Sequence, residues 1–373
     1  MAETSEAADR AFWRHLVRPE LAGLEAYVPA SHAGLRAKLD ANEAPAWCSD
    51  RVRELVREAL ARVPLERYPD PRALELKDAL ALRGAPAAGE ILIGSGSDEI
   101  IALLSVALAR PRARNPQAVI LTPTPTFVMY RVTAQAHGLK HASVPLDRDW
   151  DLDLAAMARA VDLMAPSVIY VASPNNPTGN AMTRARMAAL AAKAPGALVV
   201  IDEAYAEYQG SSVRDLRAAS PNIAILRTVS KLGLAALRIG WLEGPEDLVR
   251  EIDKARQPFN TSALSQAVVA AILRDGWTEV GAAVGAVVVE RARISEALGR
   301  MRDVVVTPSS ANFVWVRTGR PAEEVHAALL ARGVLVRSFH AAQGRMANHL
   351  RITVGSPREN DALLEAMVEA TGG

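Results

Sequence analysis

With 373 residues, the chain is long enough to bury a large core and to form two or three domains. Half of its residues are apolar and 23% are charged, which excludes a disordered or fibrous protein. The 43 basic and 42 acidic side chains leave a formal net charge of +1, so no excess of positive charge indicates a nucleic-acid-binding surface. The single cysteine, Cys48, excludes an intrachain disulfide and a cysteine cage for a metal ion.

The ends of the chain and its apolar runs bear on localisation. Residues 1–10 are acidic and polar, without the basic and apolar regions of a signal peptide. The longest apolar runs are interrupted by charges before they reach the length of a membrane span. Together with the lone cysteine, these features predict a cytoplasmic protein without a membrane partner.

The first segment, residues 1–45, has weak periodicity and predicts an arm with one short helix around residues 12–17. From Asp50 onward, apolar residues recur at helical spacing, and Ser49 or Asp50 is a suitable N-cap. This helix must end before residues 68–71, because two prolines there favour an extended or turning chain.

Between this helix and about residue 257, short β-rich runs alternate with helical patterns. Because the runs are apolar on both faces, they predict a mostly parallel sheet covered on each side by helices. The runs are residues 91–93, 118–121, 167–172, 197–201, 223–226 and 239–242. The expected fold class is α/β, with residues 46–257 as the large domain.

Beyond Pro258 the pattern changes. A long helical region at about residues 262–301 leads to four short β-rich runs with helices between them, at residues 304–307, 312–316, 334–336 and 350–354. This order predicts a smaller α+β domain over residues 258–373.

Five polar motifs follow predicted strands, which is where open α/β sheets place their ligands. In chain order they are Gly-Ser-Gly-Ser-Asp-Glu at 94–99, Ser-Pro-Asn-Asn-Pro-Thr-Gly at 173–179, Asp-Glu-Ala-Tyr at 202–205, Ser-Lys at 230–231 and Leu-Arg-Ile-Gly at 237–240. In this order they resemble the motifs of the fold-type I, class I and II aminotransferases, which use pyridoxal 5'-phosphate (PLP). The resemblance runs from about Tyr27 to the C-terminus.

Lys231 and Asp202 match the two chemically central residues of that family. An uncharged lysine amine in a partly desolvated pocket is a nucleophile that bonds to an aldehyde. The resemblance implies that Lys231 carries the cofactor and, once substrate releases it, moves the Cα proton. It also implies that Asp202 keeps the pyridine nitrogen protonated, which makes the ring an electron sink. An isolated Ser-Lys pair would favour a surface lysine, and a lone strand-end Asp would favour a helix cap.

The resemblance assigns Tyr205 and Asn176 as partners of the cofactor's ring hydroxyl, although Asn-Pro and Thr-Gly are turn signals in any protein. The aromatic Phe127 matches the residue that stacks on the ring, with a core aromatic as the equal alternative.

The turn containing Ser97 and Asp98 lies between a strand and a helix, so free N–H groups and the helix dipole can hold the cofactor phosphate. Glu99 stands at the third glycine position of a dinucleotide fingerprint, which excludes that reading of the turn. Ser230 and Arg238 match the remaining phosphate ligands of the family.

Four longer segments, at residues 39–43, 67–71, 227–238 and 350–355, resemble histidinol-phosphate aminotransferases. In that family the tyrosine matching Tyr68 reaches the cofactor phosphate of the partner subunit, which implies a homodimer. Tyr27 and Arg337 match residues that contact the substrate phosphate, and Arg351 matches the arginine that binds the anionic end of the substrate. A phosphorylated substrate needs more positive charge than one carboxylate would, and an arginine pair supplies it; a surface position is the alternative for Arg337.

The implied reaction is transamination between L-histidinol phosphate and 2-oxoglutarate. Two departures, Ala44 in place of a second asparagine and Ala236 in place of a glycine, bear on the substrate and leave the cofactor motifs intact. An aromatic aminotransferase and a threonine-phosphate decarboxylase share most of these motifs. An effector-binding domain of a transcription regulator would carry an N-terminal winged helix, for which about 45 residues without a basic recognition helix leave no room.

Overall fold

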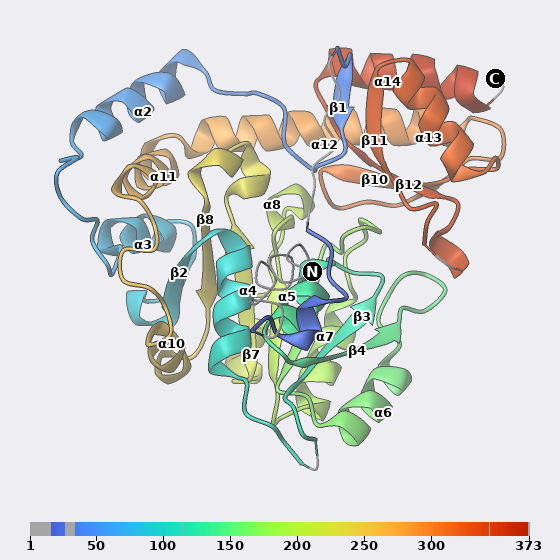
Figure 1. Ribbon diagram of the computed structural model, residues 1–373. Coiled ribbons are helices and arrows are strands. Elements are labelled where there is room, and N and C mark those ends of the chain that lie inside the picture. Colours follow the sequence, from blue (N-terminus) through green and yellow to red (C-terminus); the bar gives the residue numbers. More distant parts are fainter. Residues whose placement is uncertain (1–15, 27–33, 114, 343, 372–373) are drawn as a thin grey trace, which may run out of the picture.

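The structure, a computed structural model, describes residues 16–26, 34–113, 115–342 and 344–371. Within these ranges the chain forms a seven-stranded sheet and a five-stranded sheet with helices around both (Figure 1). The α/β class expected from the sequence is confirmed. None of the helices in these ranges is long and apolar enough to cross a bilayer.

The larger sheet has the strand order β2-β8-β7-β6-β5-β3-β4. All neighbours pair in parallel except β8, which runs antiparallel to both β2 and β7. Six of its strands are buried on both faces and match the six predicted runs. The polar strand β4 was not predicted because it lies at the sheet edge with alternating exposure. The strands are β2 Ile91–Ser95, β3 Val119–Thr124, β4 Lys140–Pro145, β5 Val168–Ala172, β6 Leu198–Asp202, β7 Ile223–Thr228 and β8 Ile239–Glu243.

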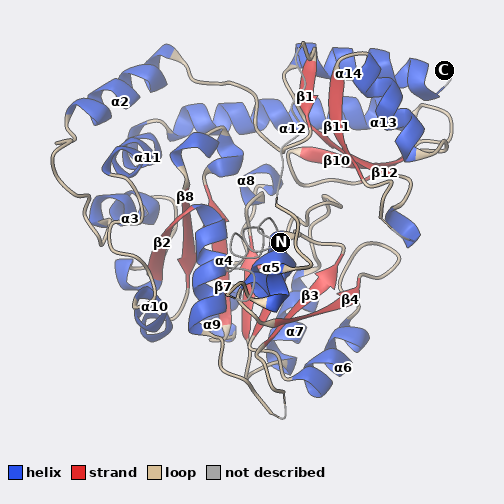
Figure 2. Ribbon diagram, viewed as in Figure 1, coloured by secondary structure: helices blue, strands red, loops and turns tan. Residues whose placement is uncertain are grey.

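Alternate residues of these strands enter two separate cores. Val199 and Ile201 of β6 pack in one apolar cluster with side chains of α6 and α7, whereas Leu198 and Val200 pack in another with side chains of α4 and α5. Helices therefore cover both faces of the sheet (Figure 2), as the two-sided apolar runs require. The helices around it are α2 Asp50–Ala61, α3 Leu74–Ala81, α4 Gly96–Ala107, α5 Met129–Ala136, α6 Leu154–Met164, α7 Arg184–Lys193, α8 Ala206–Gln209, α9 Leu216–Ala219, α10 Glu246–Asp253 and α11 Ala263–Asp275.

The smaller sheet has the order β1-β11-β12-β10-β9, with β1 parallel to β11 and the other pairs antiparallel. Its strands and helices are β1 Ala37–Leu39, β9 Val305–Thr307, β10 Phe313–Arg317, β11 Val334–Ser338, β12 His349–Thr353, α12 Trp277–Gly299, α13 Ala322–Ala331 and α14 Pro357–Thr371. Strand β1 comes from the predicted arm, residues 1–45. Helix α11, from the predicted small domain at residues 258–373, packs against α2 and α3 of the predicted large domain. The domain boundaries at residues 45 and 257 remain a prediction.

One further detail differs from the elements expected from the sequence. The helical region expected over residues 262–301 is two helices, which separate at Gly276 because α11 packs beside α2 while α12 crosses to the smaller sheet (Figure 1). The short helix expected at residues 12–17 lies mostly outside the described residues. The predicted cap of α2 is confirmed, since the Ser49 hydroxyl accepts a hydrogen bond from the Val52 N–H.

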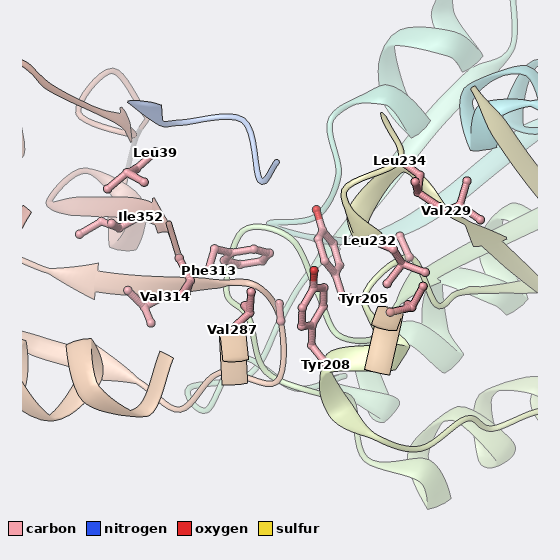
Figure 3. Close-up of a cluster of buried hydrophobic side chains, with 14 of the residues drawn as sticks. Leu39, Tyr205, Tyr208, Val229, Leu232, Leu234, Val287, Phe313, Val314 and Ile352 are labelled. Atoms are coloured by element: carbon pink, nitrogen blue, oxygen red, sulfur yellow. The ribbon is translucent and has the colours of Figure 1, made fainter. Parts of the chain in front are cut away.

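One buried apolar cluster spans both sheets. Leu39, Val314 and Ile352 approach it from the smaller sheet, and Val229, Leu232 and Leu234 from the larger one. Figure 3 shows Tyr205, Tyr208 and Phe313 between the two groups. This cluster packs against the short turn after β7, η4 Ser230–Leu232, and so holds Lys231 at the junction of the two sheets.

Candidate active site

A cavity containing Lys231 lies at the carboxyl ends of β5, β6 and β7, beside the turn between β2 and α4. Parallel strands end at the same edge of a sheet, so motifs far apart in the sequence meet there. The cavity encloses about 520 Å³ of empty space, part of it open to solvent. Every predicted cofactor-binding residue except Tyr68 lines it. The lining residues are Ser97, Asp98, Phe127, Tyr130, Ala172, Pro174, Asn176, Asp202, Ala204, Tyr205, Thr228, Ser230, Lys231 and Arg238.

Hydrogen bonds to the backbone of the turn hold Lys231 in position. The Tyr208 hydroxyl donates a hydrogen bond to the Lys231 carbonyl at 2.6 Å, and the Trp47 indole N–H donates to the Leu232 carbonyl at 2.7 Å. Gly233 then reverses the chain at a φ of 79°, a conformation that favours glycine. The half-buried Lys231 side chain places its Nζ 5.9 Å from the centroid of the Tyr205 ring. The turn thus fixes the base of the side chain while its amine remains in the cavity.

Asp202 is the buried carboxylate of the cavity, at the end of β6. Only 5% of the residue is exposed, and burial raises its pKa to about 6. Two hydrogen bonds oppose that effect: the Tyr130 hydroxyl donates to Oδ2 at 2.6 Å, and the Ala204 N–H donates to Oδ1 at 3.0 Å. Asp202 is therefore oriented on both oxygens by groups that favour its charged form.

The first turn of α4, which begins at Gly96 directly after β2, forms the anion-binding part of the cavity. Gly96 has a φ of 78°, and a Cβ there would lie 2.4 Å from the Arg238 guanidinium. A Cβ on Gly240 of β8 would lie 2.6 Å from the Ser97 backbone nitrogen, so glycine at 240 permits the close approach of this strand to the turn. The Arg238 Nη1 donates to the Ser230 Oγ at 3.3 Å. The turn, the serine hydroxyls and this guanidinium together offer N–H, O–H and positive charge to one anion.

Tyr205 and Asn176 connect the cavity to the smaller sheet and the chain before α2. The Asn42 side chain donates to the Tyr205 hydroxyl at 2.9 Å. Arg351 of β12 donates from Nη1 to the Asn176 Oδ1 at 2.7 Å and from Nη2 to the Asp40 carbonyl at 2.5 Å. A residue of the smaller sheet therefore reaches the cavity wall directly.

Arg337 and Arg351 stand directly opposite each other in the antiparallel pair β11–β12. Like charges in such a pair repel, so an anion that both contact would stabilise the arrangement. Arg337 is exposed and Arg351 is half-buried. Tyr27, the third predicted substrate contact, lies outside the described residues.

Tyr68 does not line the cavity of its own chain. It lies in the loop between α2 and α3 with 81% of the residue exposed. The departures from the family pattern also lie elsewhere: Ala44 lines a different cavity, beside Trp47 and α12, and Ala236 is exposed in a short 3-10 turn. Neither alanine is among the residues that line the Lys231 cavity.

The sequence did not predict Tyr208 and Trp47, which hydrogen-bond the backbone of the Lys231 turn, or Tyr130 and Asn42, which hydrogen-bond side chains of the cavity. Asn42 lies inside the segment at residues 39–43, and Tyr130 lies three residues after Phe127, but no local pattern shows that they contact Tyr205 and Asp202. A buried tyrosine whose hydroxyl needs a partner was the available signal for Tyr130.

The sequence model of one family, described as aminotransferase class I and II, matches residues 37–367. The chain belongs to the class I and II aminotransferases. This aminotransferase is 41% identical to the histidinol-phosphate aminotransferase of Chromobacterium violaceum, over 95% of this chain and 97% of that protein. It is 37% identical to the histidinol-phosphate aminotransferase of Aquifex aeolicus, over 93% of this chain and 96% of that protein.

Among solved structures, the histidinol-phosphate aminotransferase from Sinorhizobium meliloti in complex with pyridoxal-5'-phosphate superposes with a TM-score of 0.81. The two chains are 25% identical, and the match covers 95% of this aminotransferase and 97% of that chain. Together with the family match, this identifies a PLP-dependent enzyme that acts on small molecules, and it confirms the fold-type I aminotransferase fold.

The cavity of this aminotransferase fits PLP. The Gly96 turn, with its close packing against Arg238 and Gly240, suits a phosphate group. The buried, doubly hydrogen-bonded Asp202 suits a protonated ring nitrogen, and Lys231 supplies an amine in the same cavity.

Proposed function

We propose that the enzyme transfers the amino group of L-histidinol phosphate to 2-oxoglutarate, which gives imidazole-acetol phosphate and glutamate and is a step of histidine biosynthesis. Relatives named histidinol-phosphate aminotransferase, at 37–41% identity over nearly the full chain, support this substrate. The observation that carries it in the structure is that Arg351 contacts Asn176 of the Lys231 cavity and stands directly opposite Arg337 in the smaller sheet.

The arginine pair accounts for the two anions that one pocket must accept. Arg351 contacts Asn176 in the cavity wall, which supports a role for it at the anionic end of either substrate. Arg337 lies one strand farther out and is exposed, and it adds a second guanidinium for a dianionic phosphate. Tyr27 is the further phosphate contact that we propose for the substrate.

The remaining residues serve the cofactor. When bound, PLP supplies an aldehyde for amine exchange and a ring that takes up electrons released at Cα. Lys231 carries the cofactor and then moves the Cα proton of the substrate, and Asp202 holds the proton on the ring nitrogen. Tyr205 and Asn176 hydrogen-bond the ring hydroxyl, and Phe127 packs on the ring face. Ser97, Asp98, Ser230 and Arg238 bind the phosphate.

We further propose that the enzyme is a cytoplasmic homodimer in which Tyr68 reaches the cofactor phosphate of the partner subunit. Its exposure on a loop away from its own cavity supports this role. Exposed apolar side chains of the same region, Leu60, Leu65, Phe259 and Leu264, would be covered in such a dimer.

Half-reactions with single donors test the substrate. Losing a charge-assisted contact to a bound anion should weaken transition-state binding by about 2–4 kcal/mol. We expect Arg337→Ala to impair the half-reaction with histidinol phosphate more than that with glutamate, and Arg351→Ala to impair both. Arg317→Ala is the matched control, because Arg317 is an exposed arginine of the neighbouring strand β10.

Phenylalanine and threonine phosphate complete the set of substrates. If phenylalanine were the better donor and Arg337→Ala had no effect, the enzyme would be an aromatic aminotransferase. Release of carbon dioxide from threonine phosphate, without transamination of histidinol phosphate, would instead identify a decarboxylase.

A further inference from the structure

The Tyr68 ring is ordered by a second exposed ring. The rings of Tyr68 and Phe259 stack with centroids 4.5 Å apart and planes inclined by 14°. Tyr68 is 81% exposed and Phe259 is 40% exposed, so neither ring is held by burial in a core. Because stacking prefers such offset, nearly parallel geometry, Phe259 restricts the directions in which Tyr68 can point.

The backbone at Phe259 is in the left-handed region, with a φ of 61°. A bulky residue adopts this conformation only where the surrounding structure holds it there, and such residues are concentrated at functional sites. The structure that holds it is visible on the C-terminal side: the Asn260 side chain donates to the Glu99 carboxylate at 2.7 Å and to the Ile93 carbonyl at 3.3 Å. Phe259 is thus placed by its neighbours to present its ring outward.

Hydrogen bonds also connect the segment around Phe259 to the loop that carries Tyr68. Arg256 donates to the Asn260 Oδ1 at 2.9 Å and to the Pro71 carbonyl at 3.0 Å, and Gln266 donates to the Asp70 carbonyl at 3.2 Å. These bonds fix both ends of the stack relative to each other.

The segment around Phe259 is also hydrogen-bonded to the phosphate-binding turn of its own chain. The Glu99 carboxylate that accepts from Asn260 also accepts from the Ser95 N–H, at the start of the Gly96 turn. A glutamate at position 99, where a dinucleotide fingerprint has glycine, therefore joins the phosphate turn to the segment carrying Phe259.

We infer that Phe259 is a positioning residue, which orders Tyr68 in one chain for the cofactor site of the other chain. This inference rests on the proposed function, in which Tyr68 crosses to the partner subunit. Asn260 and Glu99 hold Phe259 in place from the phosphate turn of the same chain. A stack of this kind changes an equilibrium constant by about two- to tenfold, so its loss should weaken PLP binding at the partner's site by that factor.

Hybrid dimers with two affinity tags separate positioning from a local structural effect. In each hybrid one chain carries Lys231→Ala, so only the other chain can bond the cofactor, and its release is followed by the absorbance of lysine-bound PLP. With Phe259→Ala in the Lys231→Ala chain, the altered Tyr68 faces the intact lysine, and we expect PLP to leave about two- to tenfold faster. With Phe259→Ala in the other chain, we expect release at the unmodified rate.

Two further variants keep the test decisive. Phe259→Gly relaxes the left-handed backbone and still removes the ring, so it should reproduce the Phe259→Ala result, whereas Phe259→Tyr keeps the ring and should restore slow release. Sedimentation velocity checks that each hybrid remains a dimer. The inference would be overturned by faster release only when the change is in the lysine-bearing chain. It would also be overturned by an unchanged rate in both arrangements.

The same two hybrids with Tyr68→Phe distinguish this inference from the proposed function. If Tyr68→Phe accelerates release across the dimer and Phe259→Ala does not, then Tyr68 crosses the interface but Phe259 does not position it. If Tyr68→Phe has no effect across the dimer, the shared site itself is wrong, and the inference falls with it.

Discussion

The hydrogen bond from Tyr130 to Asp202 should set the charge of the carboxylate that serves the cofactor ring. Burial raises the pKa of Asp202 from 3.8 to about 6. The folded apoprotein therefore holds this proton to a higher pH than the unfolded chain does. The contribution of Asp202 to the free energy of unfolding therefore falls by about 3 kcal/mol as pH rises from about 4 to 6. Above that pH it is constant.

Tyr130→Phe removes a 2.6 Å hydrogen bond to the charged form of Asp202 and should raise its pKa further. A hydrogen bond to a charged group contributes about 1.5–3 kcal/mol. We expect that loss in the free energy of unfolding of the apoprotein at pH 8, and a smaller loss at pH 4.5, where Asp202 is protonated in both proteins. Urea unfolding at the two pH values measures the difference.

Tyr170→Phe is the matched control. Tyr170 is fully buried and stacks on Tyr130 with centroids 4.5 Å apart, and no partner for its hydroxyl is found among the described residues. Its loss should change stability by the same amount at both pH values. In the PLP-bound enzyme, Tyr130→Phe should lower kcat about ten- to a hundredfold with little change in KM, because Asp202 acts mainly in the transition state. Equal, pH-independent losses for Tyr130→Phe and Tyr170→Phe would refute the reasoning.

Three further outcomes are expected. Borohydride should fix the cofactor on Lys231, as peptide mass spectrometry can show, and full transamination by Lys231→Ala would contradict that role. Mixing inactive Tyr68→Phe and Lys231→Ala chains should recover activity in hybrid sites, whereas a fully active monomer in sedimentation would exclude a shared site. Gly240→Ala should weaken PLP binding at least about tenfold in a fluorescence titration, because its Cβ would lie 2.6 Å from the phosphate turn. Gly244→Ala is its control, since a Cβ there would make only ordinary contacts, the nearest at 3.6 Å. Equal affinities of the two variants for PLP would contradict the role of Gly240 at the phosphate turn.

Much of the fold follows from local pattern. Runs such as residues 197–201 are apolar at every position, and only a sheet covered on both faces buries them all. Strand β4 escaped prediction because an edge strand alternates polar and apolar residues and needs no continuous apolar run. The break at Gly276 escaped it as well, because two helices with different packing partners can share one continuous helical pattern.

The sequence by itself predicted which residues could serve the cofactor, because the motifs with Lys231, Asp202 and the phosphate turn lie at strand ends and resemble those of the family; the structure brings all three to one cavity. Only the tertiary structure decided which side chains support them. Tyr130 and Asp202 are 72 residues apart, and their contact depends on the strand order and on how α5 packs on the sheet. The opposition of Arg337 and Arg351 likewise depends on strand register, which a shift of one residue would abolish. Local patterns report which face a side chain takes, whereas contacts between distant segments are fixed only when the whole sheet is assembled.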